Sequence, residues 1–167
     1  MKIVDNSKDF IDTRNHWAKD AIDFVSARGL VNGMSATIYA PNASTTRAQL
    51  WTILARQNNA DLTGGASWYE KAQAWAKDKG VSDGADPNGA ITRAQMVTML
   101  YRAAGSPEVS ITTTFTDVPA DSYYAKAVAW AVENGITAGV GGGRFDPNST
   151  CTRAQIATFL YRLYLSR

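Results

Sequence analysis

A four-residue phrase, Thr-Arg-Ala-Gln, occurs three times in this chain of 167 residues, and no other feature constrains the fold as strongly. Pro-Asn stands before each copy, with the proline six residues ahead of the arginine. An aromatic residue and then two glycines four residues apart come earlier still, in the same order each time. Four short identities in one order indicate a tandem repeat. The copies begin at Thr46, Thr92 and Thr152.

Each repeat unit predicts a first helix from its apolar spacing. Apolar residues recur at i, i+3 and i+4, which places them on one helix face. They are Ala21, Phe24 and Val25, then Ala72, Trp75 and Ala76, then Ala127, Trp130 and Ala131. We expect these helices to begin at Trp17, Trp68 and Tyr123. They should end at Gly29, Gly80 and Gly135, because a helix C-terminus needs a residue with left-handed backbone angles.

A second helix is predicted to begin at each Thr-Arg-Ala-Gln, with a more apolar stripe. The stripe residues are Leu50, Ile53 and Leu54, then Met96, Met99 and Leu100, then Ile156, Phe159 and Leu160. One pair of helices cannot bury its own apolar face, so the three pairs must pack on one another. The sequence therefore predicts an all-α fold of three helix-loop-helix repeats, with the second helices at the centre.

The repeats are predicted at residues 10–56, 68–102 and 115–162, joined by linkers at 57–67 and 103–114 that are rich in Gly, Ser, Thr and Asn. Residues 1–9 would form an N-terminal extension and residues 163–167 a C-terminal tail. Repeats one and three open with Phe-x-Asp, at Phe10 and Phe115, which repeat two lacks. Repeat two also has a loop five residues shorter between Gly84 and Arg93. We expect repeat two to differ in structure and in function.

Charge and residue usage exclude several classes of function. The formal net charge is only +2 and Lys and Arg form no run, whereas a nucleic-acid-binding surface needs a concentrated basic face. Cys151 is the only cysteine and His16 the only histidine. No intrachain disulfide, cysteine-rich zinc site or histidine-based catalysis is therefore expected. We expect no metal, no cofactor and no enzyme activity.

The N-terminal residues, 1–9, contain no apolar core, so they are not expected to be a signal peptide. No apolar run is long enough to span a bilayer, so no membrane insertion is expected. If the protein works outside the cell, we expect this sequence to be a segment of a larger exported protein, or to lack its leader.

Thr-Arg-Ala-Gln has a structural interpretation as a capping box, in which Thr and the Gln three residues later satisfy each other's helix donors. The predicted capping residues are Thr46 with Gln49, Thr92 with Gln95 and Thr152 with Gln155. Thr45, Ile91 and Cys151 precede these caps and are expected to pack against the second helices. Cys151 is interpreted as a packing residue, because no histidine lies in its repeat to activate the thiol.

The arginine of the phrase occupies the first helical position, where the helix dipole disfavours a cation. Arg47, Arg93 and Arg153 are therefore expected to face an anion. One alternative is a carboxylate of the neighbouring repeat, such as Asp12 or Asp117. The other is a ligand carboxylate or phosphate, held by the guanidinium together with the N–H groups of the helix N-terminus. The residues alone leave both open.

The aromatic residues favour a sugar as the ligand. A ring beside an arginine and a glycine-lined backbone can stack on the C–H face of a sugar, whose hydroxyls take backbone hydrogen bonds. Trp75 and Trp130 are better explained as core, whereas Trp17, Trp68 and Tyr123 fit either interpretation. Gly33, Gly84 and Gly139 serve either as turn residues or as points where the backbone can approach a ligand.

These motifs together resemble the S-layer homology repeat, which anchors bacterial surface proteins to the cell wall. The resemblance lies in Phe-x-Asp, in the helix from Trp17 to Gly29, in the glycine turns, in Tyr39-x-Pro41 and Phe145-x-Pro147, and in Thr-Arg-Ala-Gln. It covers almost all of residues 10–162. The family's phrase usually ends in Glu, whereas all three copies here end in Gln, which removes one negative charge beside each arginine.

The resemblance implies a pseudo-threefold helical prism with a central three-helix bundle and grooves between the repeats. It implies a non-catalytic module on the cell wall or S-layer that binds a secondary cell-wall polysaccharide, typically one bearing a pyruvate ketal on N-acetylmannosamine. By this likeness Arg47, Arg93 and Arg153 would contact the pyruvate. The glycine turns and Asp12 or Asp117 would contribute to the groove walls. The groove of repeat two, where Ala85 replaces the aromatic residue, is expected to be the weakest.

Two other functions compete with this interpretation. A protein-interaction scaffold would use the arginines only to pair with acidic neighbours. A glycan hydrolase would need two carboxylates at a fixed separation across a cleft, and no such pair recurs with the motif. The acids available for it are Asp12, Asp83, Asp86, Asp117, Glu133 and Asp146.

Overall fold

The computed structural model describes residues 8–110 and 115–166, and confirms that the fold is all-α. The described residues form a short 3-10 helix, η1 (Ile11–Thr13), and six α-helices. The α-helices are α1 (Lys19–Ala27), α2 (Arg47–Gln57), α3 (Glu70–Asp78), α4 (Arg93–Ala103), α5 (Ala125–Glu133) and α6 (Arg153–Leu165). Residues 1–7 of the predicted extension and 111–114 of the second linker lie outside the described part of the chain.

The first helices of the repeats are shorter than the sequence indicates. α1, α3 and α5 each begin two residues after the aromatic residue, so the prediction that Trp17, Trp68 and Tyr123 start the helices is wrong by about half a turn. Their ends are as predicted. Gly29, Gly80 and Gly135 have φ angles of 69°, 69° and 70°, and the residue after each one donates its N–H to a helix carbonyl five positions back.

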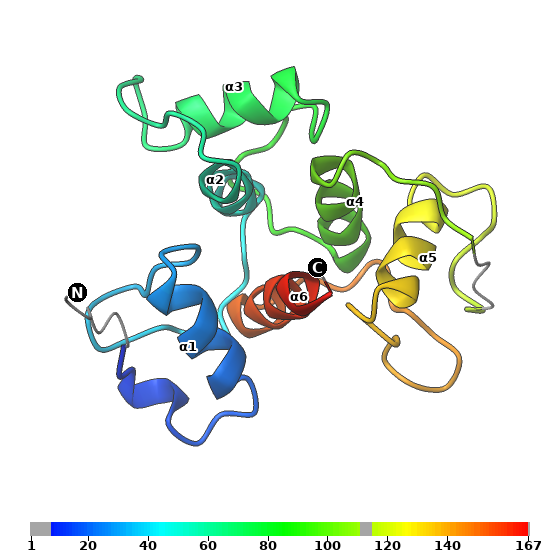
Figure 1. Ribbon diagram of the computed structural model, residues 1–167, viewed down its shortest axis with the longest axis horizontal. Coiled ribbons are helices and arrows are strands. Elements are labelled where there is room, and N and C mark those ends of the chain that lie inside the picture. Colours follow the sequence, from blue (N-terminus) through cyan, green and yellow to red (C-terminus); the bar gives the residue numbers. More distant parts are fainter. Residues whose placement is uncertain (1–7, 111–114, 167) are drawn as a thin grey trace, which may run out of the picture.

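Each first helix packs on the second helix of a different repeat. α1 lies against α6, α3 against α2 and α5 against α4, so the chain closes its ends by placing its first helix on its last. Figure 1 shows α2, α4 and α6 toward the centre and α1, α3 and α5 outside them. The apolar stripes of the second helices are fully buried, as predicted, and those of the first helices are buried or pack against the core. The contacts within each outer-inner pair are more extensive than the contact between α2 and α4.

A ring of three backbone hydrogen bonds links the repeats just before the second helices. Thr45 N donates to the Cys151 carbonyl at 2.9 Å, Cys151 N to the Ile91 carbonyl at 2.9 Å, and Ile91 N to the Thr45 carbonyl at 2.8 Å. All three residues are buried. Because each gives one bond and receives one, the ring closes with no free donor or acceptor in it and places the starts of α2, α4 and α6 around one point.

The first N–H groups of each second helix are also used between repeats. Ala48 N donates to the Pro87 carbonyl, Ala94 N to the Pro147 carbonyl and Ala154 N to the Pro41 carbonyl, each at 2.9 Å. The arginine preceding each alanine likewise donates its backbone N–H to the next loop. Helix N-termini leave such donors unsatisfied unless a partner is supplied. Here the Pro-Asn turn of the next repeat supplies it, which explains why that turn recurs at a fixed distance from the arginine.

The α-helices are short, with 9 to 13 residues each. In the described ranges, 8–110 and 115–166, no helix has the length and apolarity needed to cross a bilayer.

One residue of the ring has a buried hydroxyl without a hydrogen-bond partner. Removing this hydroxyl is expected to stabilise the fold. Thr45 Oγ1 is buried and forms no hydrogen bond, whereas the equivalent residue of repeat two is Ile91. Thr45→Val should raise the free energy of unfolding by about 1 kcal/mol, because the cost of an unpaired buried hydroxyl disappears. Thermal denaturation should show a rise in the midpoint of roughly 2–4 °C.

Thr52→Val is the matched control, because Thr52 is also buried but its hydroxyl donates to the Ala48 carbonyl at 2.9 Å. It should give no such rise. An equal gain in both variants would show that added apolar bulk, and not the unpaired hydroxyl, accounts for the effect.

Cys151 is expected to be inert while the protein is folded. Burial raises the pKa of its thiol to about 12, although the nearby Arg93 charge opposes this. At pH 8 the thiolate fraction should be roughly a thousandfold below that of an exposed cysteine. Alkylation by iodoacetamide, followed by mass spectrometry, should be slow in buffer and fast in denaturant. Rapid alkylation of the folded protein would contradict the buried position.

Candidate functional site

Three capping boxes fix the start of each second helix. The side chains of Thr46, Thr92 and Thr152 accept hydrogen bonds from the backbone N–H of the glutamine three residues on, and each glutamine's side-chain oxygen accepts from the threonine N–H. With the inter-repeat bonds to the Pro-Asn turns, every N–H at these helix starts has a partner. The expectation that free helix N-terminal N–H groups help to hold an anion is therefore wrong.

Two of the arginines are buried against the loop of the next repeat. Arg93 Nε donates to the Phe145 carbonyl at 2.9 Å, and Arg153 Nε donates to the Tyr39 carbonyl at 2.8 Å. Each guanidinium also lies over the aromatic ring of the same residue, 4.7 Å from the Phe145 centroid and 4.4 Å from that of Tyr39. The anion that the helix start requires is thus partly replaced by carbonyl dipoles and an aromatic face.

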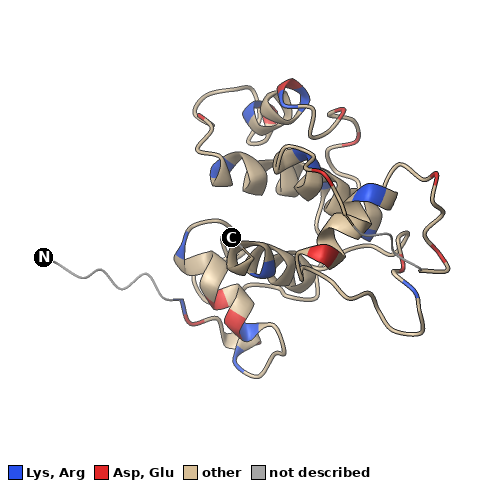
Figure 2. Cartoon of the chain, turned by 45° about the vertical axis from the view of Figure 1, so that its right-hand side comes forward, with Lys and Arg blue, Asp and Glu red and all other residues tan. Residues whose placement is uncertain are grey.

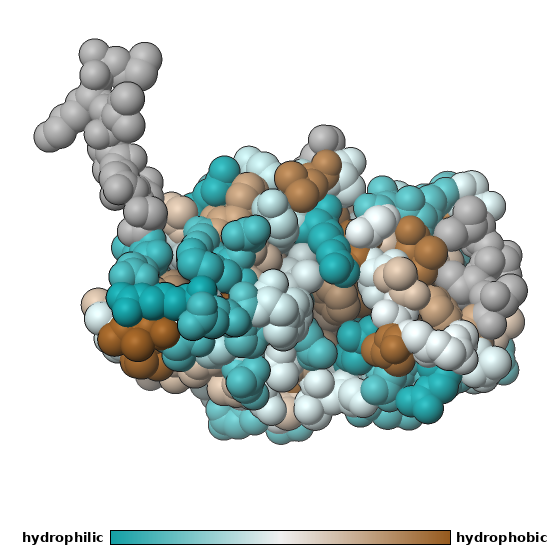
Figure 3. All heavy atoms as spheres, turned by 90° about the horizontal axis from the view of Figure 1, so that it is seen from below, coloured by the Kyte–Doolittle hydropathy of each residue, from teal (hydrophilic) through white to brown (hydrophobic). Residues whose placement is uncertain are grey.

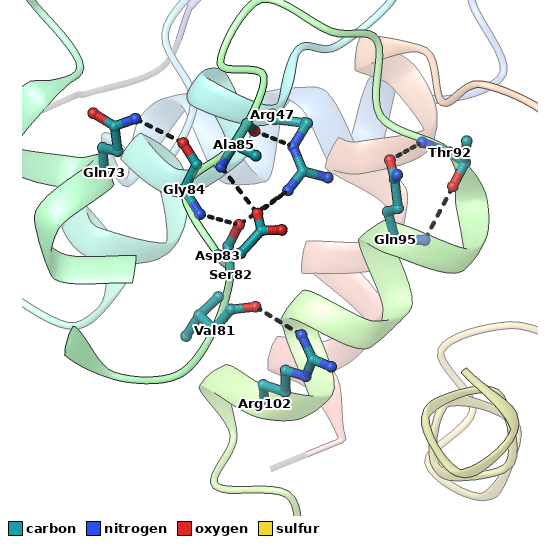
Figure 4. Close-up of polar contacts among 10 residues, drawn as sticks. All are labelled: Arg47, Gln73, Val81, Ser82, Asp83, Gly84, Ala85, Thr92, Gln95 and Arg102. Carbon is teal, nitrogen blue, oxygen red and sulfur yellow. Dashed lines mark hydrogen bonds and ion pairs between the residues drawn. The ribbon is translucent and has the colours of Figure 1, made fainter. Parts of the chain in front are cut away.

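Arg47, which belongs to repeat one, lies against the loop of repeat two and has a different environment. Its Nε donates to the Ala85 carbonyl at 2.7 Å, and its Nη2 forms an ion pair with Asp83 Oδ1 at 3.0 Å and a bond to Ser82 Oγ at 3.2 Å. Figure 4 shows this guanidinium directed into the loop that carries Asp83, with Arg102 on the neighbouring helix α4. The sequence interpretation of a neighbouring carboxylate is right for Arg47, but the acid is Asp83 and not Asp12 or Asp117.

Three grooves lie at equivalent places around the structure, and we name each after the arginine of the repeated phrase. The volumes are about 470, 160 and 130 Å³ for the Arg47, Arg93 and Arg153 grooves. Each groove takes its arginine from one repeat, its inner wall from the second helix of the next repeat, and an aromatic residue from the repeat after that. No single repeat therefore contains a complete groove.

The inner wall repeats the same residue types in all three grooves. A capping glutamine, a threonine, an apolar residue and a second arginine line it. These are Gln95, Thr98, Met99 and Arg102, then Gln155, Thr158, Phe159 and Arg162, then Gln49, Thr52, Ile53 and Arg56. Because the glutamine oxygen is engaged in the cap, its NH₂ end is the donor that it offers to the groove.

The aromatic residue of each groove is exposed. Trp17, Trp68 and Tyr123 are 68%, 64% and 62% accessible and line the Arg93, Arg153 and Arg47 grooves respectively. Rings this exposed contribute little to a core, so the core interpretation does not hold for them, and their contact with a sugar stays a prediction. Trp130 is buried and Trp75 packs against the core, as predicted for those two residues.

The second arginine of each groove was missed by the sequence analysis. Arg56, Arg102 and Arg162 each follow the first arginine of their own helix by nine residues, and a threonine stands at a fixed place between the two. This extended phrase recurs three times and would have indicated the position. A spacing of nine residues turns the two side chains of one helix by about 180°. Each helix therefore contributes to two different grooves, which only the packing reveals.

Asp12 and Asp117 hold the loops together and line none of the three grooves. Asp117 accepts from the N–H groups of Phe145 and Asp146 at 2.8 Å each, and Asp12 accepts in the same way from Tyr39 and Ala40. Partial burial raises the pKa of the Asp117 carboxyl, but these hydrogen bonds outweigh it and hold the pKa below its ordinary value. A role for either aspartate in glycan binding stays a prediction.

Of the three candidate glycines, only Gly139 lines one of the three grooves, the Arg93 groove. Its φ angle is +90°, and a Cβ atom there would come within 2.7 Å of both the Arg144 carbonyl and the Phe115 ring. A Cβ on Gly33 would meet Phe10, and one on Gly84 would meet Lys77. Close packing therefore requires Gly33 and Gly139, whereas at Gly84 the side chain of Lys77 can move and the φ angle of +76° is what favours glycine.

Charge is distributed without a dominant face. Figure 2 shows basic and acidic residues interspersed over the described helices and loops. The basic groups that gather are the paired arginines of the grooves. Burial lowers the pKa of Arg93 and of Arg153, but a guanidinium starts so high that both remain protonated at neutral pH.

Comparison with known families gives two matches along the chain. The sequence model of the S-layer homology domain matches residues 9–50 and 114–157, which contain the first and third copies of the phrase. The stretch between them contains most of α2 and the whole of α3 and α4, and there the sequence lacks Phe-x-Asp and has the shorter loop.

Several curated proteins are similar over most of the chain. An amylopullulanase of Thermoanaerobacterium thermosulfurigenes is 34% identical over 93% of it, and an exoglucanase XynX of Acetivibrio thermocellus is 32% identical over 96%. An S-layer protein of Bacillus thuringiensis subsp. finitimus is 27% identical over 87%. The chain spans only 9%, 17% and 20% of the length of these three relatives.

Removing the carboxylate of Asp117 should destabilise the third repeat. Asp117→Ala should lower the free energy of unfolding by about 1–2 kcal/mol at neutral pH, because two loop N–H groups lose their acceptor. Since the pKa of this carboxyl is lower in the folded state, its contribution is present above its ordinary pKa and is lost as pH falls. The wild type should therefore lose more stability than the variant between about pH 5 and pH 2.

Denaturant unfolding at several pH values measures this difference. Asp121→Ala, at an exposed aspartate in the same repeat, is the control and should change stability little. A difference between the wild type and Asp117→Ala that stays constant across the pH range would contradict the assignment.

Proposed function

Since the chain belongs to the S-layer homology domain family, a family of cell-wall anchoring modules, we propose that it binds an acidic secondary cell-wall polysaccharide in the grooves between its repeats. The acidic group is a carboxylate, and a pyruvate ketal on an N-acetylmannosamine is the form that we propose for it. The chain then attaches a larger surface protein to the cell wall or the S-layer, outside the cell.

The observation that carries this proposal is the composition of the grooves. Each one combines two arginines, a glutamine NH₂ group and an aromatic ring that is more than half exposed. Guanidinium and amide donors are suited to a carboxylate, and an exposed ring is suited to the apolar face of a sugar. The glutamine supports an acidic ligand more than a glutamate would, because it offers N–H donors without a negative charge.

The same composition supports a non-catalytic role. Hydrolysis of a glycosidic bond generally requires two carboxylates that face each other across the substrate. Among the described residues that line the three grooves, Asp83 is the sole acid, and it is paired with Arg47. We therefore propose that any catalysis in the parent protein belongs to other domains; this chain spans only 9% and 17% of the two relatives that are named as enzymes.

A protein-interaction scaffold is less well supported. A protein-binding site needs a buried apolar centre. On the face in Figure 3, hydrophobic residues stand in separate groups among hydrophilic ones. The three most exposed aromatic residues, Trp17, Trp68 and Tyr123, moreover, belong to three separate arginine-lined grooves.

Substitution of the groove rings tests the proposal without disturbing the core. Trp17→Ala and Trp68→Ala should each weaken binding to purified cell wall by about fivefold, because each removes the platform of one groove. Co-sedimentation with wall that retains its polysaccharide, over a range of protein concentrations, gives the affinities. Wall stripped of the polysaccharide should retain neither the wild type nor the variants.

Met34→Ala is the matched control, since Met34 is also an exposed apolar residue, at 62%, but lines none of the three grooves. It should bind as the wild type does. Equal retention of all variants, or retention on stripped wall, would contradict the proposal and favour a protein partner.

A further inference from the structure

The three grooves differ in charge at one position beside the arginine. Asn32, Asp83 and Ala138 occupy equivalent places, one residue before the second glycine of each repeat. Only the Arg47 groove therefore has a carboxylate at this position. The other groups that face an incoming ligand, namely the second arginine, the glutamine and the threonine, are the same in all three grooves.

Two hydrogen bonds hold the carboxylate of Asp83 beside Arg47. Its Oδ1 accepts from Arg47 Nη2 at 3.0 Å and from the backbone N–H of Ala85 at 2.9 Å (Figure 4). The hydrogen bond from Ala85, together with the charge of Arg47, keeps the pKa of this carboxyl below its ordinary value despite partial desolvation. Arg47 Nε is engaged by the Ala85 carbonyl, so both nitrogens that turn toward this loop have acceptors.

The arginines of the other two grooves have no such acid. Within residues 8–110 and 115–166, no carboxylate oxygen lies within 4 Å of Arg93 or Arg153. Arg93 gives its Nε to a carbonyl, and its two terminal nitrogens have no hydrogen-bond partner in that part of the chain. Arg153 gives Nε and Nη2 to carbonyls, which are neutral, so no described carboxylate is bonded to it and the charge of Asp12 acts on it only from farther away.

From this difference, and resting on the proposed function, we infer that Asp83 is an internal carboxylate that excludes the acidic sugar from the Arg47 groove. The acidic sugar then binds in the Arg93 and Arg153 grooves only. The Arg47 groove has the largest volume of the three, so its exclusion is electrostatic and not steric.

The exclusion follows from the cost of bringing two carboxylates to one guanidinium. Asp83 is largely exposed, so its own pair with Arg47 is weak and a ligand could displace the side chain. The displaced carboxylate would still lie beside the ligand's carboxylate, since the backbone of the loop stays in place. Like charges so close oppose binding, and the second arginine does not compensate, because every groove has one.

The number of binding sites tests this inference directly. Isothermal titration of the whole chain with a pyruvylated N-acetylmannosamine glycoside should give about two sites for the wild type. Asp83→Ala should add a third site and raise the affinity of the Arg47 groove by at least about tenfold. Alanine is chosen because Ala138 already stands at this position in repeat three, so the variant is expected to fold.

The exposed ring of the Arg47 groove identifies the added site. Added to Asp83→Ala, the substitution Tyr123→Ala should remove the site that Asp83→Ala creates. Glu108→Ala, which removes an exposed carboxylate that lines none of the three grooves, is the charge-matched control and should add no site. The glycoside without the pyruvate ketal should not distinguish Asp83→Ala from the wild type.

The outcomes separate this inference from the proposed function. Three equal sites in the wild type, or no added site in Asp83→Ala, would overturn the role of Asp83 while leaving the grooves as glycan sites. No binding of the pyruvylated sugar by the wild type or by any variant would overturn the proposed ligand, and the inference with it.

Discussion

The ring of backbone hydrogen bonds among Thr45, Ile91 and Cys151 is the interaction on which the rest of the structure depends. Each of these residues donates to one repeat and accepts from the other. The bonds lie in a buried place where an unpaired N–H or carbonyl would be costly. The three repeats must therefore assemble together, because a pair of repeats would leave part of the ring unsatisfied. The ring also holds the starts of the three second helices at fixed distances from one another.

The grooves follow from that assembly. A capping box sets the first helical residue, the Pro-Asn turn of the next repeat accepts the first helix N–H groups, and the arginine is thereby directed into the next repeat's loop. The remaining repeat then brings its exposed ring to the same place, from the segment just before its first helix. A local motif that stabilises a helix thus also positions the charged group of a site that no repeat builds alone.

In repeat two, another residue compensates for a missing motif. It has no Phe-x-Asp, and so no equivalent of the Asp117 carboxylate that binds two loop N–H groups. Asp83 accepts one N–H of the shorter loop instead and at the same time pairs with Arg47. Asp83, which takes over this structural role, therefore places a negative charge in the Arg47 groove. The sequence indicates that repeat two is the exception, but it does not indicate that Asp83 is the residue responsible.

The sequence by itself determined the number of units, the helical class, the buried stripes, the glycine helix ends and the threonine–glutamine caps, because these depend on spacing within about four residues. Spacing cannot report which repeats touch. Only the tertiary structure decided that α1 closes on α6, that helix N–H groups meet carbonyls and not a ligand, and that Trp17 is exposed while Trp130 is buried. The physical reason is that these features depend on residues tens of positions apart, brought together by the closure of the chain's two ends.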